Sequence, residues 1–166
     1  MSRGRSNLKI KTNIREMKSI DIEAVISIEK DVHKQPWSRK KFEDSLLNGY
    51  FCRVVESSSR VLAYIIVSHF SSHEAEVLNI AVEKSSQKKG IGTSLMDYVL
   101  VRLTALGRSE IFLEVRETNS NALRDYSKLG FVEVGRRSNY YGVRRQKKED
   151  ALIMNRKLQK WVEKSR

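Results

Sequence analysis

A short glycine turn between an apolar run and an amphipathic segment constrains the fold more than any other feature. The turn reads Gln87-Lys88-Lys89-Gly90-Ile91-Gly92 and follows the apolar run over residues 77–82. The segment after the turn stops at Gly107 and carries apolar residues at helical spacing, namely Leu95, Met96, Val99, Leu100, Leu103 and Leu106. We therefore expect a strand, a turn and a core-facing helix in succession.

The composition of this turn also predicts a kind of ligand. Glycines allow the backbone to approach an anion closely, and the N–H groups at the start of a helix attract negative charge. The spacing Q-x-x-G-x-G matches neither the dinucleotide fingerprint nor the P-loop. The turn is therefore expected to hold the phosphates of some other ligand.

Periodicity on either side of the turn predicts a mixed α/β sheet with helices on its faces. Helices are expected over residues 20–32, 38–47 and 120–129. Strands are expected over residues 51–56, 61–70, 76–82, 111–115, 131–135 and 151–158, and the short run 111–115 is expected to be buried on both faces. This pattern indicates one domain over residues 13–160, with a short tail at 161–166. The basic residues 1–12 are expected to form a loose tail or a frayed first strand.

Composition narrows the class of protein. The chain has 166 residues, and an apolar fraction of 40% does not fit a disordered chain or a membrane protein. Because Cys52 is the single cysteine and no apolar leader precedes residue 13, we expect a cytoplasmic protein. No metal-ligand spacing is visible in the sequence. The net charge of +12 favours an anionic partner such as RNA, the ribosome or a polyphosphate ligand, or else reflects a generally basic surface.

Glu114 is the first candidate for chemistry, because it interrupts the apolar strand at 111–115. Burying a carboxylate in such a strand costs free energy unless the carboxylate is ion-paired, lies at an open strand edge or has a functional role. Partial burial would raise its pKa toward neutrality, which suits a general base. The alternative is a buried ion pair, for which Arg116 on the same strand face is a candidate.

Most other candidates have more than one interpretation. Tyr126 is either a core residue or a general acid toward a thiolate. Asn119 can cap the helix that follows it and also contact a ligand. Trp37 is either a core aromatic or part of a substrate groove, whereas Cys52 is expected to be a small core residue. The basic stretch at 136–148 could touch RNA, form a solvated loop or select a substrate.

Taken together, these blocks resemble the GNAT acyltransferase superfamily. The similarity lies in Leu78-Asn79-Ile80-Ala81-Val82, in Gln87-x-x-Gly90-x-Gly92 and in Tyr126-x-x-Leu129-Gly130-Phe131. Within the superfamily the chain is similar to the RimI subfamily over about residues 13–158. The further blocks are His33-x-x-Pro36-Trp37-Ser38, Leu113-Glu114-Val115-Arg116, Asn139-Tyr140-Tyr141 and Glu149-Asp150-Ala151-x-Ile153-Met154.

The resemblance implies a fold and a donor. The sheet would contain two splayed parallel strands with acetyl-CoA between them, and no metal would be needed. Backbone groups of Ile80, Ala81 and Val82 would lie beside the pantetheine. The pyrophosphate would be bound by N–H groups of Lys88, Lys89, Gly90, Ile91, Gly92 and Thr93, and Asn119 would help to hold the donor. Glu114 would be the base and Tyr126 the acid.

The resemblance also implies an acceptor. Members of the RimI subfamily acetylate the N-terminal alanine of a small-subunit ribosomal protein. A lysine or small-amine acceptor is the nearby alternative, and a basic ribosome- or RNA-binding module with a degenerate acetyl-CoA site is the more distant one. Gly142 stands where the related proteins usually have proline, so the loop beside the expected acceptor groove departs from their pattern.

Overall fold

A seven-stranded sheet forms the centre of the molecule. The computed structural model describes residues 10–69, 71–141 and 148–158. The strands are β1 (Asn13–Glu16), β2 (Phe51–Ser57), β3 (Arg60–His69), β4 (Glu74–Val82), β5 (Glu110–Arg116), β6 (Val132–Tyr141) and β7 (Glu149–Lys157). The helices are α1 (Ile22–Val32), α2 (Arg39–Leu47), α3 (Ile91–Ala105) and α4 (Ser120–Lys128), with short 3-10 helices at Ser19–Asp21 and Lys84–Ser86.

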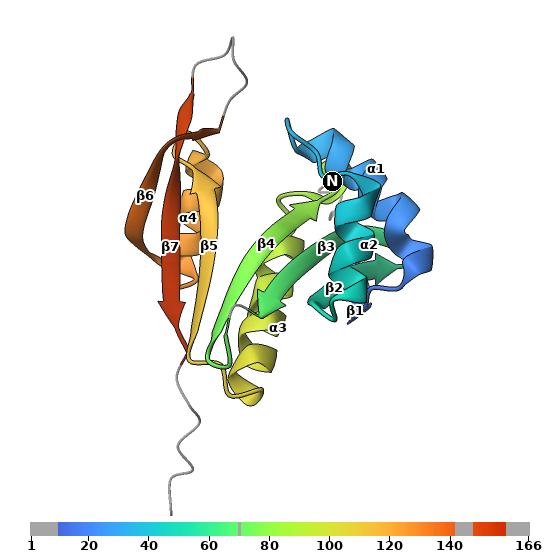
Figure 1. Ribbon diagram of the computed structural model, residues 1–166. Coiled ribbons are helices and arrows are strands. Elements are labelled where there is room, and N and C mark those ends of the chain that lie inside the picture. The colour runs from blue at the N-terminus through green and yellow to red at the C-terminus, as the bar shows by residue number, and fades with distance from the viewer. Residues whose placement is uncertain (1–9, 70, 142–147, 159–166) are drawn as a thin grey trace, which may run out of the picture.

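The strand order is β1-β2-β3-β4-β5-β7-β6 (Figure 1). β4 and β5 run parallel, and every other neighbouring pair is antiparallel. A parallel pair needs a crossover, which α3 supplies between β4 and β5. The predicted mixed α/β sheet is thereby confirmed.

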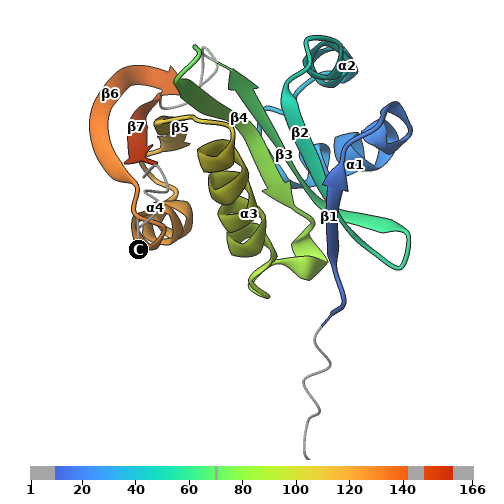
Figure 2. The ribbon, with the colours of Figure 1, turned by 90° about the horizontal axis from the view of Figure 1, so that it is seen from below.

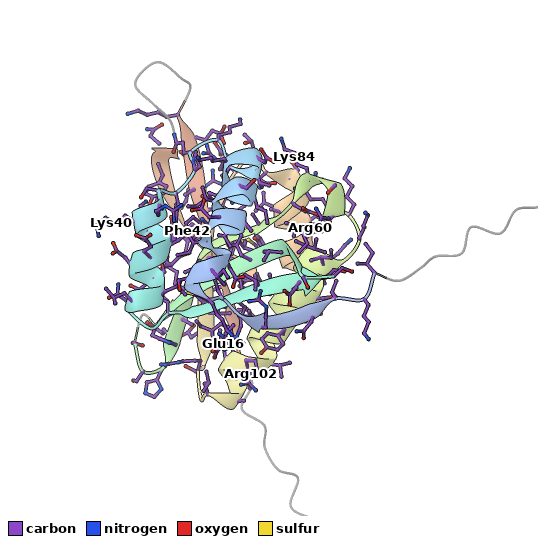
Figure 3. The ribbon with its side chains drawn as sticks, turned by 90° about the vertical axis from the view of Figure 1, so that its right-hand side faces the viewer. Glu16, Lys40, Phe42, Arg60, Lys84 and Arg102 are labelled. Atoms are coloured by element: carbon purple, nitrogen blue, oxygen red, sulfur yellow. The ribbon has the colours of Figure 1, made fainter. Side chains whose placement is uncertain are left out.

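Helices cover both faces of the sheet and enclose two cores. In Figure 2, α3 and α4 lie on one side of the sheet, and α1 and α2 lie on the other. The first core packs α3 against the sheet through residues such as Leu95 and Leu103, and the second packs α1 and α2 through residues such as Val25 and Phe42. Figure 3 shows Phe42 turned from α2 toward the sheet and Lys40 turned away from it.

The parallel strands separate partway along their length. Their pairing runs from Glu74 opposite Glu110 to Val77 opposite Leu113, and Figure 1 shows β4 and β5 diverging beyond this point. The β3–β4 register shifts here and leaves Leu78 as an extra residue in β4. Because a bulge bends its strand and increases the local twist, Leu78 gives a physical cause for the separation.

Most predicted elements are confirmed, with three differences. β1 lies at Asn13–Glu16, just after the tail at 1–12 in which a frayed first strand was one expectation, and four residues beside a polar tail give little periodic signal. Leu106 is 57% exposed rather than part of the core stripe, because it lies at the C-cap of α3. Burial of β5 on both faces was wrong: only alternate residues are buried, and Glu114 lies on the other face.

Some predictions lie outside the described residues. They concern residues 1–9 of the N-terminal tail, the C-terminal tail at 161–166, Phe70 and residues 142–147 of the basic stretch. The domain boundaries remain predictions. Within the described ranges, no helix is both long and apolar enough to cross a membrane.

Candidate active site

The separation of β4 from β5 opens a cleft of about 1200 Å³. Its walls are the ends of these two strands, the glycine turn (residues 87–92), one side of α4 and the segment between α1 and α2 (residues 33–38, hereafter the α1–α2 segment). Ligand sites of this kind are typically concave and lie where strands diverge. The cleft therefore joins elements from most of the chain into one site.

The glycine turn lines the cleft and lies between β4 and α3, which is its predicted place in the chain. Gln87 Nε2 donates a hydrogen bond to the Val82 carbonyl at 3.0 Å and ties the turn to the end of β4. Lys88 and Gly90 have φ values of 60° and 80°, and Gly90 is the N-cap of α3. The first N–H groups of α3 have no acceptor within the helix, so they are available to an anion.

Most predicted donor-binding residues line this cleft. They are Ile80, Ala81, Val82, Lys88, Gly90, Ile91, Gly92, Thr93 and Asn119. Lys89 differs, because its Nζ donates to the Ser85 carbonyl at 2.8 Å and its side chain lines a separate hollow with Ser85 and Ser86. Asn119 caps α4 by accepting a hydrogen bond from the Ala122 N–H at 3.3 Å.

Glu114 and Tyr126 both line the cleft. Glu114 is 16% exposed and lies on β5 just beyond the last pair with β4. Its partner is Arg137 of β6, whose Nε lies 3.2 Å from Glu114 Oε1. The sequence had suggested Arg116 as the ion-pair partner of Glu114. In the structure, Arg116 Nη1 lies 4.0 Å from Glu149 Oε2. Strand register across β7 brings Arg137 close, and sequence spacing alone does not show this.

Tyr126 both packs in the core and borders the cleft, and its role as a general acid stays a prediction. The ring packs against the core beside Phe131, with centroids 5.8 Å apart. The same side chain is only partly buried and borders the cleft. The tyrosine is therefore held by packing while remaining at the surface of the site.

A second carboxylate lies near Glu114. Glu76 of β4 has a raised pKa, chiefly because it is partly buried and secondly because Glu114 is close, whereas Arg137 opposes the shift. Arg137 also lies over the ring of Tyr140, 5.3 Å from its centroid. One arginine thus acts on two acidic groups, of which Glu114 lines the cleft.

The α1–α2 segment forms the opposite wall through Trp37 and its neighbours. Trp37 is half-buried, and its ring centroid is 5.3 Å from that of Phe42, so it belongs both to the core and to the cleft. Cys52, by contrast, is buried in the core as predicted, and burial raises its pKa to about 11. A thiol in this state is a poor nucleophile.

Sequence reasoning missed a buried polar network behind this wall. Glu29 is 1% exposed and accepts hydrogen bonds from the Trp37 backbone N–H, from Tyr64 Oη and from Asn79 Nδ2. A signal was present: Glu29 follows Ile22, Val25 and Ile26 on the apolar stripe of α1. Such a position predicts a carboxylate with donors around it.

Residues 22–131 match the family described as the acetyltransferase (GNAT) family. The chain belongs to this family. An Escherichia coli K12 relative of this GNAT protein, named [ribosomal protein bS18]-alanine N-acetyltransferase, is 33% identical over 141 residues, which cover 85% of this chain and 94% of the relative.

Solved structures agree with the GNAT fold. The crystal structure of the Escherichia coli ribosomal-protein-S18-alanine N-acetyltransferase matches with a TM-score of 0.85 and 30% identity, covering 94% of this chain and 99% of that one. The structure of yncA from Salmonella typhimurium, with its cofactor acetyl-CoA, matches with a TM-score of 0.74. That likeness covers 89% of this chain and 94% of the other at 20% identity, so it bears on the fold alone.

Proposed function

We propose that the protein transfers an acetyl group from acetyl-CoA to the N-terminal α-amine of a ribosomal protein, with alanine as the first residue. The observation that carries the proposal is the arrangement of one cleft, which is lined by the glycine turn before α3 and by a glutamate and a tyrosine. The relative named for acetylation of ribosomal protein bS18 supports this acceptor.

The residues of the cleft fit acetyl-CoA as a donor. Backbone groups of β4 from Ile80 to Val82 border the gap left by β5 and can pair with the amides of a pantetheine arm. The N–H groups at the start of α3 suit a pyrophosphate, and the positive charge of Lys88 adds to their attraction. Acetyl-CoA supplies a thioester, which an amine can attack without a metal.

Glu114 and Tyr126 have complementary tasks in this mechanism. An N-terminal α-amine has a pKa of about 7.7–8.0, so a carboxylate base can remove its proton near neutral pH. With the proton on Glu114, directly or through water, the amine nitrogen bonds to the acetyl carbon. As the carbon–sulfur bond breaks, Tyr126 donates its phenolic proton to the leaving thiolate.

A peptide series tests the acceptor. The protein is incubated with acetyl-CoA and with peptides that differ in their first residue, that carry a blocked N-terminus, or that offer only a lysine amine. We expect N-terminal acetylation with preference for alanine, detected by mass spectrometry. A preference for lysine would change only the acceptor, whereas tight RNA binding without any acetylated product would support the binding-module alternative.

Replacing Tyr126 by phenylalanine tests the acid. Because the ring stays packed beside Phe131 while the proton donor is lost, turnover should fall by about 10²-fold or more. The affinity for CoA, measured by calorimetry, should change little. Unaffected turnover would assign Tyr126 to the core alone.

A further inference from the structure

The buried carboxylate of Glu29 connects the α1–α2 segment to the sheet. Its Oε1 atom accepts hydrogen bonds from the Trp37 N–H at 2.7 Å and from Asn79 Nδ2 at 3.1 Å. Its Oε2 atom accepts from the Tyr64 hydroxyl and lies 3.5 Å from His33 Nε2. These donors come from β3, from β4 and from both ends of the α1–α2 segment.

The chemistry of the donors makes this arrangement rigid. A buried carboxylate is stable only when its oxygens accept hydrogen bonds, so movement of any donor is costly. Burial, together with the charge of Glu29, raises the pKa of Tyr64 and keeps its hydroxyl protonated as a donor. The Trp37 backbone is therefore held at a fixed place relative to the core.

His33 extends the connection to the donor side of the cleft. Its Nε2 atom lies 3.1 Å from the Ile80 carbonyl oxygen as well as 3.5 Å from Glu29. Both neighbours are acceptors, so Nε2 carries the hydrogen. One ring thus ties the α1–α2 segment to the strand that borders the proposed pantetheine site.

We propose that Glu29 is a positioning residue for the acceptor, which holds the α1–α2 segment at a fixed distance from β4 and so sets the width of the acceptor side of the cleft. This inference rests on the proposed function. The donor end of the cleft is built from the glycine turn and α3, whereas the hydrogen-bond donors to Glu29 lie on β3, on β4 and in the α1–α2 segment. Loss of Glu29 should therefore affect the acceptor more than acetyl-CoA.

Glu29→Gln tests the proposal with almost no change in volume. The new amide nitrogen is itself a donor and faces donors, so the Trp37 and His33 contacts cannot all persist. We expect the KM for an acceptor peptide to rise about tenfold and the KM for acetyl-CoA to change less than about twofold. An unchanged acceptor KM would overturn the proposal.

Tyr64→Phe is the matched control, because it removes a donor to the same carboxylate from the core side. Both variants should lower the Tm, but only Glu29→Gln should raise the acceptor KM. An equal rise in both variants would mean that Glu29 acts through stability alone. If Glu29→Gln does not fold, His33→Gln breaks the same connection from the half-buried end and should give the same KM pattern.

Hydrogen exchange provides a readout that does not depend on turnover. Amides of residues 33–38 should exchange faster in Glu29→Gln than in Tyr64→Phe, since the glutamine has one acceptor oxygen in place of two and cannot accept from both Trp37 and His33. Unchanged exchange would show that Glu29 does not hold the segment. If the wild-type protein acetylates no N-terminus while this exchange difference is found, the proposed function fails and the holding role stands.

Discussion

The cleft has a glutamate on each side, and the two are held in opposite ways. Glu29 on the α1 side is 1% exposed and surrounded by donors from the backbone and from three side chains. Glu114 on the β5 side is 16% exposed, and its ion-pair partner Arg137 is itself 54% exposed. A buried carboxylate with several donors, such as Glu29, cannot exchange its partners, whereas a carboxylate with one exposed ion-pair partner, such as Glu114, can.

This difference in partners indicates which glutamate suits general-base catalysis and which suits a positioning role. A general base must release one partner and take up a proton, so a single exposed partner is an advantage. A positioning residue must do the reverse and keep every contact during turnover. Residue type alone would not distinguish the two, because the distinction comes from the donors around each carboxylate.

The largest effect should follow Glu114→Gln. Loss of the proton acceptor is expected to lower kcat/KM about 100-fold or more, because general-base catalysis typically contributes that much. The Kd for acetyl-CoA should stay nearly constant in calorimetry. Glu117→Gln is the matched control, since Glu117 is a more exposed glutamate whose partner is Arg136. Equal activity of wild type and Glu114→Gln would remove Glu114 as the base.

Arg137→Gln should have a smaller effect and tests whether the partner of Glu114 is exchangeable. An exposed ion pair contributes about 0.2–1 kcal/mol, so the free energy of unfolding should fall by no more than this. We expect kcat/KM to change less than about fivefold, which is under 1 kcal/mol. Arg136→Gln provides the control. A loss as large as that of Glu114→Gln would show that Arg137 holds Glu114 as firmly as Glu29 is held.

The smallest effect concerns Glu76 and depends on pH. Because its folded-state pKa is raised above the usual 4.5, its ionised form disfavours folding, and this penalty develops as the pH rises above that value. Glu76→Gln should therefore raise the Tm at pH 7 by about 1–2 °C. The difference should vanish near pH 4, as measured by thermal unfolding across the range. A Tm difference that grows toward low pH would contradict a raised pKa for Glu76.

The parts of the structure that sequence could predict are those specified locally. The glycine turn, α3 and the strand carrying Glu114 follow from hydrophobic periodicity and from residues such as Gly90, whose φ of 80° favours glycine. Asn119 as the cap of α4 was predictable for the same reason. These elements are determined by neighbours within a few positions.

The parts that sequence missed depend on contacts between distant segments. Arg137 reaches Glu114 only because β7 lies between β5 and β6, an order that spacing along the chain does not reveal. The donors to Glu29 come from positions as far away as Asn79. Hydrophobic periodicity carries no information on contacts between segments that are far apart in the sequence.

The bulge at Leu78 has a consequence for how the sheet avoids unwanted partners. Backbone groups of β4 beyond Val77 face a gap rather than β5, as the groups of an outermost strand face solvent. Outermost strands attract other polypeptides and can seed aggregation. Here the unpaired edge lies inside the sheet rather than at its rim, and residues of α3 and of the α1–α2 segment line the same cleft.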